Sequence, residues 1–204
     1  TDMRNMFNGA TSANPDVSGW DTSKVIDMSY MFGKSGIKKI NLSKWKLNEE
    51  VLKDNNTEGM FSGCSKLEYL KTPAGMRTNI SVAGDEDFKI VLLRKGESPV
   101  VEKESENLKN GYIINNNNNV LTHIYRKDKY VGVVFDKNGG NYEGWMNHEI
   151  VSKDKNIKDS KGVLPETKPE REGHKFLGWS KSKIATVPDF DENTIVNGDT
   201  TAYA

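Results

Sequence analysis

The chain has 204 residues, of which 35% are hydrophobic and 28% charged, and its 29 basic side chains balance its 29 acidic ones. The longest apolar runs, such as Val131–Phe135, are far shorter than the roughly 18 residues that a membrane-spanning helix needs. The formal net charge is zero, and the sequence has no block of basic residues of the kind that binds nucleic-acid phosphates, so we expect no nucleic-acid partner. The low apolar fraction favours several small modules over one large core.

The cysteine content and the start of the chain limit other classes. Cys64 is the only cysteine, which excludes a disulfide framework and a site built from several thiolates. The chain starts at Thr1 with neither an initiator methionine nor a signal peptide, and we expect it to be a segment of a longer protein.

A repeat opens the chain. The segment Asp2–Phe7 recurs 25 residues later at Asp27–Phe32 as Asp-Met-x-x-Met-Phe, and a third Met-Phe pair begins at Met60. This period and the spacing Ile-x-x-Ile-x-Leu from Ile37 match leucine-rich repeats, whose units run about 20–29 residues. Each unit would bury its Met-Phe pair by stacking on its neighbours. We predict strands at Val17–Trp20, Lys39–Trp45 and Leu67–Thr72, with helical or irregular returns at Thr22–Phe32 and Glu49–Phe61.

The repeat has a recognisable pattern. The run Trp20–Val25, followed by Asp-Met-x-x-Met-Phe, resembles the repeat of BspA-type leucine-rich surface proteins of bacteria. The resemblance covers residues 1–76 and implies a solenoid on the cell surface that adheres to host or bacterial partners. The second unit is longer than the first, so we expect a bulged loop at Glu49–Asn56, and Pro73 with Gly75 suggests that the solenoid ends there.

Three residues of the repeat could have a role beyond packing. Trp20 and Trp45 could stack on a ligand, but residues that recur at the repeat period are more often structural. Cys64 could be a nucleophile, but an inert thiol in the repeat core is favoured.

Residues 77–130 lose the period. Short β-branched and aromatic runs, such as Phe88–Leu93 and Val120–Tyr125, alternate with turn residues, which predicts strands. The run Asn115–Asn119 could be an aggregation-prone tract, but a hairpin connection is the simpler interpretation. We predict a small antiparallel β domain that covers the open end of the solenoid.

The last part has a second recognisable pattern. Val133–Gly140 reads as a strand that enters an Asn-Gly turn, and Pro169–Trp179 reads as a turn followed by a strand. With Asp189–Asp191 and Thr201–Ala204, these segments resemble the Listeria–Bacteroides repeat, which is also known from the B-repeat of internalin B. The resemblance covers residues 131–204 and implies a β-grasp-like fold in a spacer or adhesive module.

Two residues depart from the pattern of that family. His174 stands where the family usually has Tyr, and Ala202 stands where it has Leu, so we expect a loosened edge of the small core.

Three short segments match known functional motifs only in part. Leu164–Lys168 resembles a sortase signal, but Lys168 replaces the required Gly. His148-Glu149 would begin a zinc-protease motif, but Ser152 occupies the place of the second His. Asp136-x-Asn-x-Gly resembles a calcium loop, but Asn147 stands where the bidentate Glu should be, and a hairpin turn is the simpler reading.

The candidate site residues are therefore few. His123, His148 and His174 have no spacing typical of a metal site or a proton relay. We expect no catalytic residue, no cofactor and no metal, and the sequence does not identify the ligand-binding residues.

Together these patterns predict a modular α+β chain in three parts. Residues 1–76 would form BspA-type leucine-rich repeat units at the end of a solenoid. Residues 77–130 would form a small antiparallel β cap or linker, and residues 131–204 a β-grasp-like Listeria–Bacteroides repeat.

The expected function is binding. We expect a fragment of a bacterial cell-surface protein that is not an enzyme and that adheres to a protein ligand on the host matrix, on a cell surface or on another bacterium. The expected location is extracellular, at the cell surface or cell wall, with membrane attachment only through an anchor outside this fragment, and the expected state is a monomer. Two alternatives stay open: a structural stalk or spacer that displays another domain, and an accessory region of a surface enzyme.

Overall fold

The computed structural model describes residues 1–53, 56–141 and 148–204. Contacts between Cα atoms divide the chain into two compact units. The first unit comprises residues 1–92 and 101–128, and the second comprises residues 93–100 and 129–204. The three-part division of the sequence at residues 76 and 130 stays a prediction.

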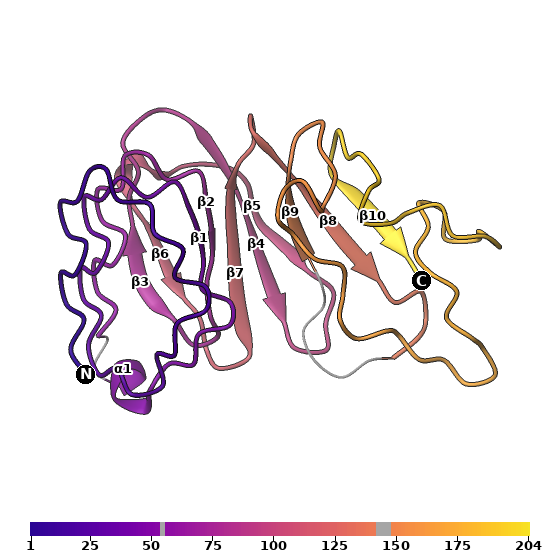
Figure 1. The fold of residues 1–204 in the computed structure, drawn as a ribbon, viewed down its shortest axis with the longest axis horizontal. Helices are drawn as coiled ribbons and strands as arrows, with labels where there is room; N and C mark the ends of the chain where they lie inside the picture. Colours follow the sequence, from indigo (N-terminus) through magenta and orange to yellow (C-terminus); the bar gives the residue numbers. More distant parts are fainter. Residues whose placement is uncertain (54–55, 142–147) are drawn as a thin grey trace. The chain divides into compact units, whose positions relative to one another are not determined.

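The described part of the chain is mostly β structure, so the prediction of an α+β class is wrong (Figure 1). Its only α-helix is α1 (Glu49–Lys53), accompanied by a short 3-10 helix at Leu108–Asn110. The strands are β1 (Lys39–Asn41), β2 (Tyr69–Lys71), β3 (Arg77–Ile80), β4 (Asp87–Arg94), β5 (Val100–Asn107), β6 (Tyr112–Asn115), β7 (Val120–Arg126), β8 (Tyr130–Asp136), β9 (His148–Ser152) and β10 (Thr200–Tyr203).

The first unit begins with three stacked turn segments, which we call the turn ladder. It consists of residues 2–9, 27–34 and 56–63. Backbone N–H groups of alternate residues in one segment donate to carbonyl groups of the next. The Phe7 N–H lies 2.8 Å from the Met31 carbonyl, and the Phe32 N–H lies 3.1 Å from the Met60 carbonyl. The repeat in the sequence is thus a repeat of hydrogen-bonded layers.

Left-handed backbone angles explain why these segments turn instead of forming helices. Each segment has two residues with φ between 54° and 72°, at equivalent positions of the repeat, and a helix cannot pass through such a residue. These residues are Asn5, Tyr30 and Gly59 at the first position, and Gly9, Lys34 and Gly63 at the second. The return at Thr22–Phe32, predicted as helical or irregular, is therefore a series of turns. In the described part of the return at Glu49–Phe61, the five-residue helix α1 and turns are present.

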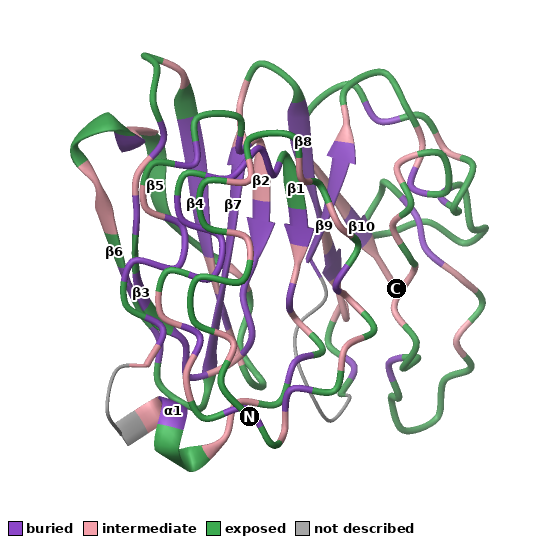
Figure 2. Cartoon of the chain, turned by 60° about the vertical axis from the view of Figure 1, so that its left-hand side comes forward, coloured by how far each residue is buried: buried purple, intermediate pink, exposed green. Residues whose placement is uncertain are grey.

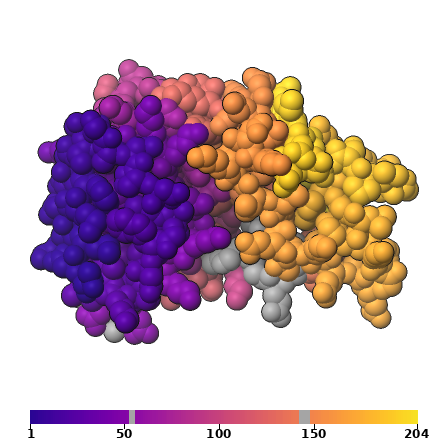
Figure 3. All heavy atoms as spheres, viewed as in Figure 1, coloured from indigo at the N-terminus to yellow at the C-terminus, as the bar shows by residue number. Residues whose placement is uncertain are grey.

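Aromatic rings stack along the inside of the turn ladder. The rings of Phe7 and Phe32 have centroids 5.4 Å apart, and those of Phe32 and Phe61 have centroids 5.7 Å apart, both pairs nearly parallel. The Met-Phe pairs of the second and third segments are fully buried, which confirms their predicted place in the core. In the first segment Met6 is 48% exposed, because no layer covers it. This first segment lies at the surface of the unit and is drawn in indigo in Figure 3.

The described residues do not form the predicted leucine-rich solenoid. Val17–Trp20 is a turn and not a strand, and in the described part of the repeat the only parallel strand pair is β1 with β2, three residues each. β2 then pairs with β7 in the antiparallel sense, which ends the parallel stacking after one pair. The predicted bulge at Glu49–Asn56 includes residues 54–55, which lie outside the described residues.

Three strands of the middle segment join the repeat, and two others form a small sheet of their own. β7, β4 and β5 extend the pair β1-β2 into a five-stranded sheet with the order β1-β2-β7-β4-β5, while β3 and β6 form a separate antiparallel pair (Figures 1 and 2). The asparagine run connects β6 to β7, which lie in different sheets, so the predicted hairpin is wrong. Asn116 is buried there. Its side-chain N–H donates to the Thr72 hydroxyl at 2.9 Å, and its side-chain oxygen accepts the Thr122 hydroxyl at 2.7 Å.

The second unit has a three-stranded sheet with the order β10-β8-β9. β9 is antiparallel to β8, and β10 is parallel to it. The described residues of this unit include no helix, so the α+β, β-grasp-like prediction is not confirmed for it. Its core contains Val131, Val133, Phe135, Val151, Ile157, Trp179, Phe190, Val196 and Ala202. Ala202 is fully buried in this core, and His174 lies exposed outside it.

The two methionines at equivalent positions of the turn ladder make a matched test of burial. We expect Met31→Ala to lower the free energy of unfolding of the first unit by about 2–5 kcal/mol, because it leaves a cavity in a packed core. Met6→Ala should cost less than about 1 kcal/mol, because its side chain is half in water. Urea denaturation of both variants measures the difference, and equal losses would contradict the layered packing.

Candidate functional site

The residues that the sequence singled out for chemistry do not assemble into a reactive site. His123 lies buried on β7, His148 lies buried on β9, and His174 lies on an exposed loop. A search of the described residues found no group of three or more His, Cys, Asp or Glu side chains that could hold a metal. The predicted mismatch of the calcium motif at Asn147 lies outside the described residues. No helix within the described ranges is long and apolar enough to cross a membrane.

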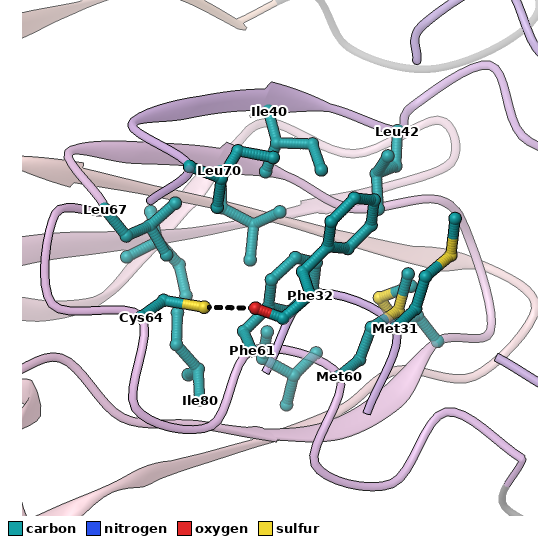
Figure 4. Close-up of a cluster of buried hydrophobic side chains, with 14 of the residues drawn as sticks. Met31, Phe32, Ile40, Leu42, Met60, Phe61, Cys64, Leu67, Leu70 and Ile80 are labelled. Atoms are coloured by element: carbon teal, nitrogen blue, oxygen red, sulfur yellow. Dashed lines mark hydrogen bonds between the residues drawn. The ribbon is translucent and has the colours of Figure 1, made fainter. Parts of the chain in front are cut away.

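Cys64 is a buried thiol in the core of the first unit. Its S–H donates to the carbonyl oxygen of Phe32 at 3.0 Å, and its sulfur lies 3.9 Å from the Ser35 hydroxyl (Figure 4). Burial raises the pKa of the thiol to about 11. The thiolate is the nucleophilic form, so this residue is unreactive at neutral pH, as the sequence predicted.

The two tryptophans of the repeat differ in their surroundings. Trp45 is buried, and its indole N–H donates to the carbonyl of Val17 at 2.9 Å, which gives it a structural role. Trp20 is partly buried and lies beside Phe7, with ring centroids 6.2 Å apart. The packing of both residues is that of repeat positions.

A hollow in the described part of the second unit, which we call the loop cleft, is the candidate site. Its volume is about 250 Å³. Four segments line it: residues 137–140, 169–178, 180–188 and 203–204. This volume is just below the roughly 300–1,000 Å³ of sites for small molecules and cofactors. The loop cleft therefore has room for one or two side chains of a partner.

An Asn-Gly turn forms one wall of the loop cleft. Asn138 and Gly139 have φ of 49° and 83°, the left-handed conformation that the Asn-Gly pair predicted. The carboxylate of Asp136 accepts the N–H of Asn138 at 2.7 Å, and the N–H of Gly140 donates to the Lys137 carbonyl at 2.8 Å. These bonds set the turn at the end of β8.

The side chain of Asn138 joins three walls of the loop cleft. Its Nδ2 donates to the carbonyl of Lys183 at 2.9 Å and to the carbonyl of Ala204 at 3.0 Å. This amide links the turn after β8 to the loop 180–188 and to residue 204, in addition to the backbone bonds between Ser180 and Tyr203. Asn138 is thus a positioning residue for the loop cleft.

An aromatic cluster supports the cleft from the core side. Trp179 packs edge-on against Phe135 and Phe176, with ring centroids 5.0 and 5.3 Å away. The next residue before it, Gly178, has a φ of 152°, and a Cβ atom there would lie 2.8 Å from the ring of Pro188. The Pro188 end of the loop 180–188 therefore packs directly on the segment that carries Trp179.

Two aspartates hold the loop that follows. The pKa of Asp189 is lowered because the backbone N–H of Lys181 donates to its carboxylate at 2.8 Å. The pKa of Asp191 is lowered because the hydroxyl of Thr194 donates to it at 2.9 Å. Both carboxylates are therefore charged at neutral pH and accept bonds within their own loop.

The rim of the loop cleft combines apolar and cationic side chains. Leu177 and Val187 are 66% and 71% exposed, an unusual position for large aliphatic residues. The charged lining residues are Lys137, Arg171 and Lys175, accompanied by His174. None of the described residues that line the cleft is an aspartate or a glutamate.

The sequence did not identify this site. Its pattern contains two segments that build the cleft, the Asn-Gly turn and the Pro169–Trp179 run, but it predicts only turns and strands there and no binding site. The exposed aliphatic residues come from stretches without periodicity. A count of large apolar residues in the loop 177–187 could have drawn attention to it.

Comparisons with known proteins agree with the two sequence patterns. Residues 1–72 match the family model described as "Mycoplasma protein of unknown function, DUF285". Residues 132–204 match the model of the Listeria-Bacteroides repeat domain. Neither the curated proteins nor the solved structures gave a match to the chain.

The two family matches support a bacterial surface repeat protein. They are consistent with a non-catalytic fragment of such a protein, and they suggest an extracellular or cell-surface location. They do not show a leucine-rich repeat in residues 1–72.

The burial of Cys64 predicts slow alkylation of the native protein. At pH 8 the thiolate fraction at a pKa of about 11 is on the order of 10²-fold smaller than in an unfolded chain, where the pKa is about 8.5. We expect iodoacetamide to label the unfolded chain within minutes and the folded chain at least about 10²-fold more slowly, as measured by intact mass. Rapid native labelling would show that the thiol is accessible.

The raised pKa of Cys64 also predicts a pH dependence of stability. Above pH 8.5 the unfolded state loses this proton first, so the free energy of unfolding should fall as the pH rises toward 11.

The amide of Asn138 can be tested by a nearly isosteric change. Asn138→Asp replaces the donor with a carboxylate that faces two carbonyl oxygens, and we expect a loss of about 1–3 kcal/mol in the stability of the second unit. Asn197→Asp makes the same chemical change at an exposed position of this unit and should stay within about 0.5 kcal/mol of the parent. Urea denaturation followed by tryptophan fluorescence reports both values. Equal effects of the two changes would refute the role given to Asn138.

Proposed function

We propose that this chain is a non-catalytic, protein-binding segment of a bacterial surface protein, and that the loop cleft is its contact site for the partner. The observation that carries this proposal is the exposure of Leu177 and Val187 at the rim of a formed hollow. Apolar side chains that stay in water beside a concave surface are typical of contact sites between proteins.

The rigidity of the loop cleft supports a binding role. Its walls are fixed by the amide of Asn138 and by the aromatic cluster around Trp179. A surface that is ordered before binding loses little conformational entropy when a partner docks. The size of the cleft suits one or two anchoring side chains of a protein, as in interfaces where few residues supply most of the binding energy.

A spacer role is the second candidate. Each unit has a hydrophobic core of its own, one around the Met-Phe pairs and one around Phe135 and Trp179. Serial modules with independent cores suit a chain that displays another domain. This candidate does not explain the exposed aliphatic residues at the loop cleft, so we rank it second.

The proposal predicts binding that depends on the rim of the loop cleft. We expect the 204-residue chain to bind saturably to at least one partner among purified extracellular-matrix proteins, epithelial cells and other bacteria. A double variant with Leu177→Ser and Val187→Ser should weaken that binding about 10- to 100-fold, because partial burial of the two side chains by the partner contributes about 1.4–2.8 kcal/mol in total. Surface plasmon resonance on the purified partners, and flow cytometry on the cells, measure both.

The matched control changes two exposed aliphatic residues of the same unit that do not line the cleft. A double variant with Val163→Ser and Ile195→Ser should bind within about twofold of the parent. Binding that responds equally to both double variants would refute the loop cleft as the contact site. Absence of saturable binding to every partner would refute the binding function of this segment and favour the spacer.

A further inference from the structure

The charges of the loop cleft indicate what kind of partner it fits. Arg171 and Lys175 lie exposed in its lining, and no ion pair joins either of them to a carboxylate among the described residues. Lys158 of the same unit, by contrast, lies 3.8 Å from Glu192. The loop cleft thus presents two cationic side chains, Arg171 and Lys175, that form no ion pair with the described residues and lie next to aliphatic side chains.

The guanidinium of Arg171 is placed by the backbone around it. It lies over the Asn-Gly turn, where a Cβ atom on Gly139 would be 3.8 Å from Nη1. The preceding residue, Glu170, exchanges two backbone hydrogen bonds of 2.6 Å with Asn141, which fixes the chain at this point. Arg171 is therefore a donor group on an ordered segment beside the hollow.

The nearby carboxylates lie outside the loop cleft. Glu170 and Glu172 line a neighbouring depression together with Lys168, and they are absent from the lining of the loop cleft. Arg171 lines both hollows, whereas the glutamates on either side of it line only the neighbouring depression. The cleft itself keeps an excess of positive charge although the chain as a whole has none.

We propose that the loop cleft recognises an acidic peptide segment of a partner protein, in which a carboxylate stands next to an aliphatic or aromatic side chain. This inference rests on the proposed function and names the chemistry of the partner. Arg171 and Lys175 bind the carboxylate, and the surface of Phe176, Leu177 and Val187 covers the apolar side chain. A guanidinium with a carboxylate is the strongest ordinary charge-assisted pair in proteins.

A polyanion without apolar groups fits the cleft less well. Nucleic acids and phosphate polymers are bound mainly by many clustered cations, whereas about half of this lining is apolar and the cations are few. Burying Leu177 and Val187 requires an apolar partner group. The mixed lining therefore favours a peptide over a phosphate polymer.

The test uses the 204-residue chain and synthetic peptides. The first probe is a capped hexapeptide that contains three acidic residues around one Leu, the second replaces each acid with its amide, and the third replaces each acid with Lys. Inorganic polyphosphate is the fourth probe. We expect the acidic peptide to bind with a Kd near 1 mM, to shift amide NMR signals of residues 137–140 and 171–178, and to bind at least about tenfold tighter than the amide peptide. The affinity should fall as salt is added.

Matched charge variants separate the cleft from general attraction. A variant with Arg171→Gln and Lys175→Gln should bind the acidic peptide at least about tenfold more weakly. A variant with Lys153→Gln and Lys161→Gln removes the same charge from exposed positions outside the cleft and should have less than about a twofold effect. Equal effects would overturn the proposal, as would equal binding of the acidic and amide peptides or tighter binding of polyphosphate.

The outcomes also separate this inference from the proposed function. If protein partners bind in a way that depends on Leu177 and Val187 but the acidic peptide does not bind, the contact site stands and its preference for acidic segments is refuted. If neither proteins nor peptides bind, the proposed function fails as well. Binding of the acidic peptide that is lost in the Arg171 and Lys175 variant supports both.

Discussion

The first unit depends on the hydrogen bonds between the layers of the turn ladder. Two left-handed residues in each layer turn the chain so that alternate N–H groups point to the next layer, and this geometry places one Phe ring over another. Buried backbone groups are costly when they lack partners, so the ladder satisfies the polar backbone and stacks the core at the same time. The five-stranded sheet then continues from this frame, because β2 pairs with β1 on one side and β7 on the other.

In the second unit, the equivalent role belongs to a short polar turn. The Asn138 amide adds side-chain bonds from the turn after β8 to the loop 180–188 and to the residue after β10, and the rings of Phe135 and Trp179 pack in the core of the same unit. The segments between β9 and β10 contain only short bridges and turns in their described part, so side-chain contacts and not a sheet position them. This explains why a formed hollow with exposed aliphatic residues occurs here and why its lining comes from four separate stretches of the chain.

A module of this kind combines stable cores with a contact surface of little area. The family matches support a surface repeat protein, and the loop cleft is the position at which we propose that it contacts a partner. In this proposal the cations and aliphatic residues act together: the charges would attract and orient a carboxylate over a distance of about 10 Å at ordinary salt, and apolar contact would supply affinity only at close range. Selectivity would then come from shape and local charge, as a chain with zero net charge requires.

The sequence by itself determined the features that depend on neighbouring residues. The repeat offset, the burial of the later Met-Phe pairs, the left-handed Asn-Gly turn and the inert Cys64 all follow from local pattern and residue chemistry. The predicted α+β class was wrong, because six left-handed residues in the ladder, three of them not glycine, turn the chain where the repeat pattern allowed a helical return. Only the tertiary structure decided that β7 joins β2 and that Arg171 meets Leu177 and Val187 at one hollow. Such contacts join residues far apart in the chain, and their choice depends on how whole layers pack, which no local spacing records.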